Sequence, residues 1–117
     1  MVKREVAVST HASPMDALHA ALAADEWDVV VSDYTMPQFG GLDALKIVRA
    51  FDPDLPFIIN SGNIGEDIAV EAMHAGAHDY VMKSNLSRLV PAIERELREA
   101  VLRREGRRAQ RELLENE

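Results

Sequence analysis

The chain has 117 residues, no cysteine and a formal net charge of −7 at pH 7. This length suits a single domain with its own hydrophobic core, and the lack of cysteine excludes disulfides and thiolate metal sites. The negative charge argues against a nucleic-acid surface, and no apolar run is long enough for a membrane span or a signal peptide. We therefore expect a cytoplasmic domain that binds neither nucleic acid nor membrane.

Short apolar runs alternate with helical patterns along the first 83 residues. Strands are predicted at 5–9, 28–33, 56–60 and 78–83. The helices between them are expected from Pro14, from about Gly41 to Ala50, and from Glu66 to about Ala75. Apolar strands that alternate with helices indicate an α/β fold, with a parallel sheet covered by helices on both faces.

A long helix is predicted at the C-terminal end of the sequence. Pro91 fits a regular helix only within the first turn, so we expect a loose turn at 85–89 and a continuous helix from about residue 88–90 onward. The apolar stripe of this helix is narrow, and the segment after Val101 is mostly charged. We therefore predict a domain over residues 1–100 and a projecting helical extension over residues 101–117.

Three polar residues stand at the ends of three different predicted strands. These residues are Asp33, Ser61 and Lys83. Right-handed crossovers place the carboxyl ends of parallel strands on one edge of the sheet, so we expect the three side chains to meet there. Taken singly, each is most simply a polar residue at a strand end. Together they suit phosphoryl chemistry, with Asp33 as nucleophile, Ser61 as a hydrogen-bond donor and Lys83 as a neutralising cation.

The motifs around these residues resemble the receiver domain of two-component response regulators over residues 5–100. The matching segments are Val-Val-Val-Ser-Asp33-Tyr-Thr-Met-Pro-Gln-Phe-Gly-Gly-Leu, Phe-Ile-Ile-Asn-Ser61-Gly, Ala-Gly-Ala-His-Asp-Tyr80 and Val-Met-Lys83. The resemblance implies a flavodoxin-like fold and a signalling module rather than an enzyme. It implies Asp33 as phosphoacceptor, Ser61 and Tyr80 as switch residues and Lys83 as the active-site lysine. It also implies Mg²⁺ bound by Asp33 and the Thr35 backbone carbonyl, and a sensor histidine kinase or phosphotransfer protein as partner.

The sequence departs from that family at its beginning. Receivers of this kind start with an extra strand that carries two adjacent metal-binding acids, followed by a helix, and the strand lies mid-sheet in the order 2-1-3-4-5. These 117 residues contain neither element, so we expect an N-terminally truncated sheet of about four strands and a weak or absent Mg²⁺ site. Either the strand at 5–9 moves inward to pair with the strand at 28–33, or a second chain covers the gap as a homodimer, by strand or domain swapping.

Three functions remain open from the residues. The first is a response-regulator receiver that accepts a phosphoryl group at Asp33 in a histidine-kinase phosphorelay, with impaired Mg²⁺ binding. The alternative is a truncated receiver that acts without phosphorylation as a dimeric interaction or scaffold protein. A phosphatase-type enzyme is least favoured, because it needs a second acid two residues after the nucleophile and Thr35 stands there.

Overall fold

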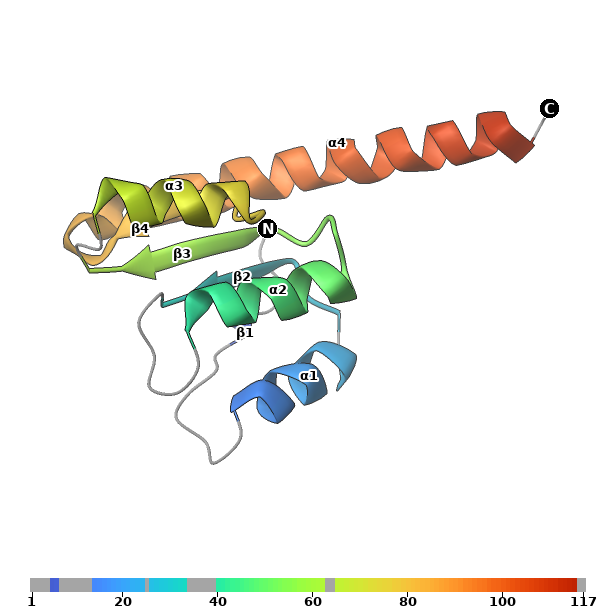
Figure 1. The fold of residues 1–117 in the computed structure, drawn as a ribbon. Helices are drawn as coiled ribbons and strands as arrows, with labels where there is room; N and C mark the ends of the chain where they lie inside the picture. Colours follow the sequence, from blue (N-terminus) through green and yellow to red (C-terminus); the bar gives the residue numbers. More distant parts are fainter. Residues whose placement is uncertain (1–4, 7–13, 25, 34–39, 63–64, 116–117) are drawn as a thin grey trace.

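The computed structural model describes residues 5–6, 14–24, 26–33, 40–62 and 65–115. Four strands alternate with helices along the chain (Figure 1). The strands are β1 (Glu5–Val6), β2 (Val29–Ser32), β3 (Phe57–Ser61) and β4 (Asp79–Met82). The helices are α1 (Pro14–Ala24), α2 (Gly41–Phe51), α3 (Glu66–His74), the 3₁₀ helix η1 (Lys83–Arg88) and α4 (Leu89–Glu115). The described elements follow the predicted alternation.

The sheet is parallel throughout, in the order β1-β2-β3-β4. β1 pairs directly with β2, with Glu5 opposite Val29 and Val6 opposite Val30. This is the first of the two predicted arrangements, in which the initial strand moves inward. Of the strand predicted at 5–9, residues 7–9 lie outside the described part of the chain.

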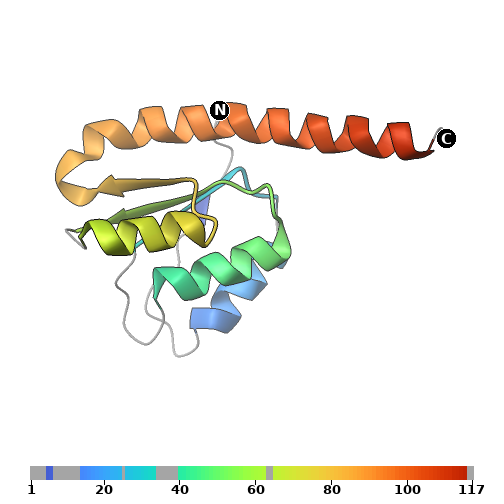
Figure 2. The same ribbon diagram turned by 45° about the horizontal axis from the view of Figure 1, so that its top comes forward.

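Both faces of the sheet are covered, as expected, but unequally. Helices α1, α2 and α3 lie on one face, and α4 crosses the other (Figures 1 and 2). Val30 and Phe57 belong to the core beneath the three helices, whereas Val29 and Ile58 belong to the core beneath α4. Successive strand residues point to opposite faces, so a strand buried on both sides must be apolar at nearly every position.

The ends of α2 and α3 are set by local backbone contacts. The Asp52 N–H donates to the Val48 carbonyl at 2.8 Å and closes α2 just before Pro53. After α3, Gly76 adopts a φ of +113°, in the left-handed region that favours glycine. The N–H groups of Gly76 and Ala77 donate to the carbonyls of Met73 and Ala72. This is the Schellman arrangement that ends many helices.

The last helix begins where Pro91 requires. The loose turn predicted at 85–89 is the 3₁₀ helix η1, and α4 starts at Leu89, which places Pro91 in its first turn. Ala100 is the last buried residue of α4, and almost every later side chain up to residue 115 is exposed. Figure 2 shows α4 continuing past the sheet, and the molecule measures 50 × 30 × 27 Å. None of the described helices is both long and apolar enough to span a membrane.

Candidate functional site

The carboxyl edge of the sheet carries the three polar residues picked out from the sequence. β2 ends at Ser32 with Asp33 directly after it, and β3 ends at Ser61. β4 ends at Met82, and Lys83 opens η1. Because the strands are parallel and adjacent in the sheet, all three residues lie on the same edge.

Asp33 is the centre of this edge. The Ser61 hydroxyl donates to Asp33 Oδ1 at 2.9 Å, and the Lys83 ammonium contacts Asp33 Oδ2 at 2.5 Å. Ser61 is only 2% exposed, whereas the Lys83 side chain is 53% exposed and that of Asp33 is 30% exposed. The structure therefore brings the three predicted residues together, with the carboxylate held between a buried hydroxyl and a solvent-exposed cation.

Tyr80 lies next to this group. Its hydroxyl donates to the Gly62 carbonyl at 2.7 Å, so its side chain contacts the loop that leaves β3 immediately after Ser61. Arg88 contacts the Tyr80 carbonyl at 2.5 Å and pairs with Asp79 at 2.8 Å, which ties η1 back to β4. Sequence reasoning did not single out Arg88, because an arginine nine residues after its partner carries no local motif.

The described residues at this edge are a poor set of ligands for Mg²⁺. The resemblance found in the sequence implies Mg²⁺, a cation that prefers six oxygen ligands in octahedral geometry. No group of three or more acidic, histidine or cysteine side chains within the described ranges could hold a metal ion. Both Asp33 oxygens already accept from Ser61 or Lys83, and Thr35, the predicted carbonyl ligand, lies outside the described residues.

A cavity of about 460 Å³ lies at the opposite, amino edge of the sheet. Its walls come from residues that precede β2 and β3 and from one side chain of α4, namely Glu26, Trp27, Asp28, Phe51, Asp52, Leu55 and Arg104. The Trp27 indole donates to the Ala21 carbonyl at 2.8 Å, which fixes the ring against α1. This cavity is therefore separate from the Asp33 group and belongs to the other end of the strands.

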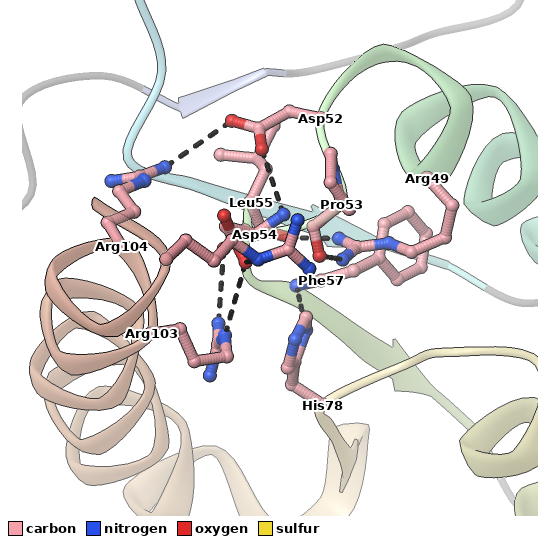
Figure 3. A network of polar contacts seen from close by, with 10 residues as sticks. Arg49, Asp52, Pro53, Asp54, Leu55, Phe57, His78, Arg103 and Arg104 are labelled. Carbon is pink, nitrogen blue, oxygen red and sulfur yellow. Dashed lines mark hydrogen bonds and ion pairs between the residues drawn. The ribbon is translucent and has the colours of Figure 1, made fainter. Parts of the chain in front are cut away.

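A polar network joins the α2–β3 loop to β4 and α4 at the amino edge (Figure 3). His78 Nδ1 accepts the Phe57 N–H at 3.0 Å, and the Arg49 guanidinium donates to the carbonyls of Pro53 and Leu55. Burial, followed by the positive charges of Arg49 and Arg103, lowers the pKa of His78 to about 4. His78 is therefore a neutral hydrogen-bond acceptor near neutral pH, which the sequence did not indicate.

Comparison with known families gives one match over most of the chain. The family described as "Response regulator receiver domain" matches residues 1–94. Among curated proteins, the C4-dicarboxylate transport transcriptional regulatory protein DctD of Rhizobium meliloti is 42% identical over 76 residues, which are 65% of this chain and 16% of that protein. The chemotaxis protein CheY of Thermotoga maritima is 36% identical over 69 residues, which are 58% of each chain. The chain thus spans less than two thirds of the length of either relative.

Solved structures agree with that match. The crystal structure of a response regulator receiver domain protein from Clostridium thermocellum has a TM-score of 0.66 and 30% identity, and the match covers 74% of this chain and 70% of that one. The crystal structure of NtrX from Brucella abortus in complex with ATP has a TM-score of 0.71 and 30% identity, covering 78% of this chain and 21% of that one. The likeness extends over most of the described fold.

Proposed function

Because the chain belongs to the family of response regulator receiver domains, we propose that Asp33 accepts a phosphoryl group from a sensor histidine kinase or a phosphotransfer protein. A receiver domain is a signalling module rather than an enzyme. The observation that carries the proposal is the position of Asp33, whose two oxygens contact Ser61 and Lys83 at the carboxyl edge of the sheet. We place the module in the cytoplasm as part of the same proposal.

The proposed transfer is a substitution at phosphorus. An Asp33 oxygen attacks the phosphorus atom of a phosphohistidine, a new O–P bond forms, and the N–P bond breaks with its electron pair left on the histidine ring. The ring nitrogen then takes up a proton. Lys83 is within contact of the carboxylate before transfer and would neutralise charge on the phosphoryl oxygens.

Ser61 and Tyr80 are the proposed switch residues. The Ser61 hydroxyl, which now donates to Asp33, can donate to a phosphoryl oxygen on the same residue instead. Such a shift would move the end of β3 and the loop at Gly62, which the Tyr80 hydroxyl contacts. The structural change that follows phosphorylation at Asp33 would therefore be transmitted to β4 through the Tyr80 side chain.

The direct test is the mass of the intact chain after treatment with a small phosphodonor such as phosphoramidate, with and without Mg²⁺. The wild-type chain should gain one phosphoryl group, and Asp33→Asn should gain none. Asp28→Asn is the matched control, because Asp28 immediately precedes the same strand at its opposite end. A wild-type chain that gains no phosphoryl group under either condition would refute the proposal.

A second candidate function is a dimeric scaffold that acts without phosphorylation. It is favoured by apolar side chains of α4 that remain exposed. Val90 and Val101 of α4 are 59% and 51% exposed, and the described part of the β1–β2 ladder has two residue pairs. A second copy, including a strand- or domain-swapped one, could bury this surface. Sedimentation at micromolar concentration should then give a homodimer whose stability does not change with phosphodonor or Mg²⁺. A monomer at that concentration would exclude the scaffold function.

A further inference from the structure

The second half of α4 has little apolar support. Ala100 is the last buried residue of the helix, and among the residues described after it up to Glu115 only Arg103 is half-buried, the others being exposed. Leu102 and Leu113, for example, are 66% and 70% exposed. An isolated, highly charged helix of this length is marginal in water. Contacts other than a hydrophobic core must therefore help to keep these turns helical.

Such contacts include ion pairs to the α2–β3 loop, which we call the arginine clasp: Arg103, Arg104 and Arg107 with Asp52 and Asp54. Figure 3 shows Arg103 and Arg104 of α4 next to this loop. Arg107 Nε lies 3.2 Å from Asp54 Oδ1, and Arg104 pairs with Asp52 Oδ2 at 3.4 Å. Arg103 lies 4.0 Å from Asp54 Oδ1 and donates to the Asp54 carbonyl at 3.1 Å. The clasp thus joins the first turns beyond Ala100 to the body of the domain.

The acidic half of the clasp is fixed by the loop itself. Asp54 is only 7% exposed, and its N–H donates to Asp52 Oδ1 at 2.8 Å. Arg49 holds the same loop through the carbonyls of Pro53 and Leu55. Because the acids are held in place by the α2–β3 loop, the part that can move is the helix, whose Arg104 and Arg107 side chains are 44% and 57% exposed.

Gly106 stands inside the span of the clasp. Arg103 and Arg104 precede it and Arg107 follows it, so the ion pairs lie on both sides of the weakest helix-forming residue in this half of α4. No atom lies within 4 Å of the position that a Cβ would take at Gly106. Packing therefore does not require a glycine here, and an alanine would fit without strain.

We propose that the arginine clasp and Gly106 form an order–disorder device that sets the length of the rigid C-terminal helix. With the clasp closed, α4 is helical to Glu115. With the clasp open, the helix loses its ties on either side of Gly106, and residues 107–115 unwind while residues 92–100 stay docked on the sheet. The device goes beyond phosphoryl acceptance and does not depend on it, since the clasp lies at the opposite edge of the sheet from Asp33.

Amide hydrogen exchange on the full chain tests this device. Asp54→Asn should speed exchange at residues 107–115 by about fivefold or more and leave residues 92–100 unchanged, since a change of 1 kcal/mol corresponds to about a fivefold shift in a two-state equilibrium. Salt at about 1 M should act on the wild-type chain in the same direction, because it shortens the Debye length to about 3 Å and so weakens ion pairs between exposed charges. Asp67→Asn, at an exposed acid in the first turn of α3, is the matched control and should change nothing.

Gly106→Ala should change hydrogen exchange in the direction opposite to Asp54→Asn. It should slow exchange at residues 107–115 by roughly fivefold, because alanine is favoured over glycine inside a helix. Arg107→Gln replaces Asp54→Asn if loss of the buried acid unfolds the domain. The device is ruled out if exchange at residues 107–115 is unchanged by the clasp variants and by salt, or if these residues already exchange as an unfolded peptide in the wild-type chain.

Discussion

The two edges of this sheet use acidic residues in different ways. At the carboxyl edge, the Asp33 side chain is 30% exposed and contacts two donors, Ser61 at the end of β3 and Lys83 directly after β4. At the amino edge, Asp54 is 7% exposed and pairs with arginines from α4. The first acid is open to an incoming reagent from solvent, whereas the second is enclosed by the chain's own cations.

The difference shows why an ionic network alone does not mark a site of chemistry. The amino edge has several charged residues and a cavity of about 460 Å³, but its polar groups fix a loop and a helix in place. At the carboxyl edge, the described polar groups converge on a single carboxylate from separate strands. This separation predicts that substitutions at Asp33 or Lys83 change phosphoryl acceptance, whereas substitutions at the amino edge change stability and leave phosphoryl acceptance unaltered.

The largest expected effect is that of Lys83→Ala. The variant should accept a phosphoryl group from phosphoramidate on the order of 10²- to 10³-fold more slowly, because it removes a cation placed where charge develops in the transfer. The rate can be followed by intact mass over time. Lys46→Ala, at an exposed lysine of α2, is the control and should keep the wild-type rate. Equal rates for the two variants would contradict the role assigned to Lys83.

A smaller effect is expected at the amino edge, from the neutral histidine. The pKa of His78 is about 4 in the folded chain against an ordinary value of 6.5. As the pH falls, His78 is therefore protonated in the unfolded chain at a higher pH than in the folded chain. The free energy of unfolding should fall as the pH drops from about 6.5 towards 4. The ring is partly exposed, so we expect a loss on the order of 1–2 kcal/mol from this residue.

The variant His78→Asn sharpens this prediction. Its side-chain oxygen can still accept the Phe57 N–H, but it does not titrate. Urea unfolding between pH 4 and pH 6.5 should show a flatter pH dependence than in the wild-type chain, and phosphoryl acceptance at neutral pH should be unaltered. A wild-type slope in the variant would mean that another group is responsible.

The smallest expected effect is that of Tyr80→Phe at the carboxyl edge. The change removes one exposed hydrogen bond, to the Gly62 carbonyl, and keeps the ring packed on the core. Urea unfolding should show a loss of about 0.5–1 kcal/mol, at the low end for a single hydrogen bond. Tyr80→Leu, which also removes the ring, should cost more. Equal losses in the two variants would mean that the ring contributes nothing.

The strands and the Asp33 group were predictable because each rests on a local signal. Val29–Ser32 and Phe57–Ser61 are short apolar runs with a polar residue at or just after their end, and parallel topology then fixes where those residues meet. The direct pairing of β1 with β2 was left open as one of two arrangements, since the number of strands alone does not decide which neighbour the initial strand takes.

The amino edge was not predictable in the same way. Asp54 and Arg107 are 53 positions apart in the sequence and pair only because α4 runs back across the sheet. Glu96 stands in a run of charged residues typical of a solvated helix face, yet it is 2% exposed, because its side of α4 is turned to the sheet. Such contacts depend on the angle at which a helix docks, which residue spacing does not specify.

The most direct test of the central claim is to locate the phosphoryl group on the chain. Borohydride converts an aspartyl phosphate to homoserine, which peptide mass mapping can assign to one residue after treatment with phosphoramidate. We expect homoserine at position 33 in the wild-type chain and in Asp54→Asn alike. Homoserine at another acid, such as Asp52 or Asp54, or at none, would contradict the assignment of Asp33 as the phosphoacceptor.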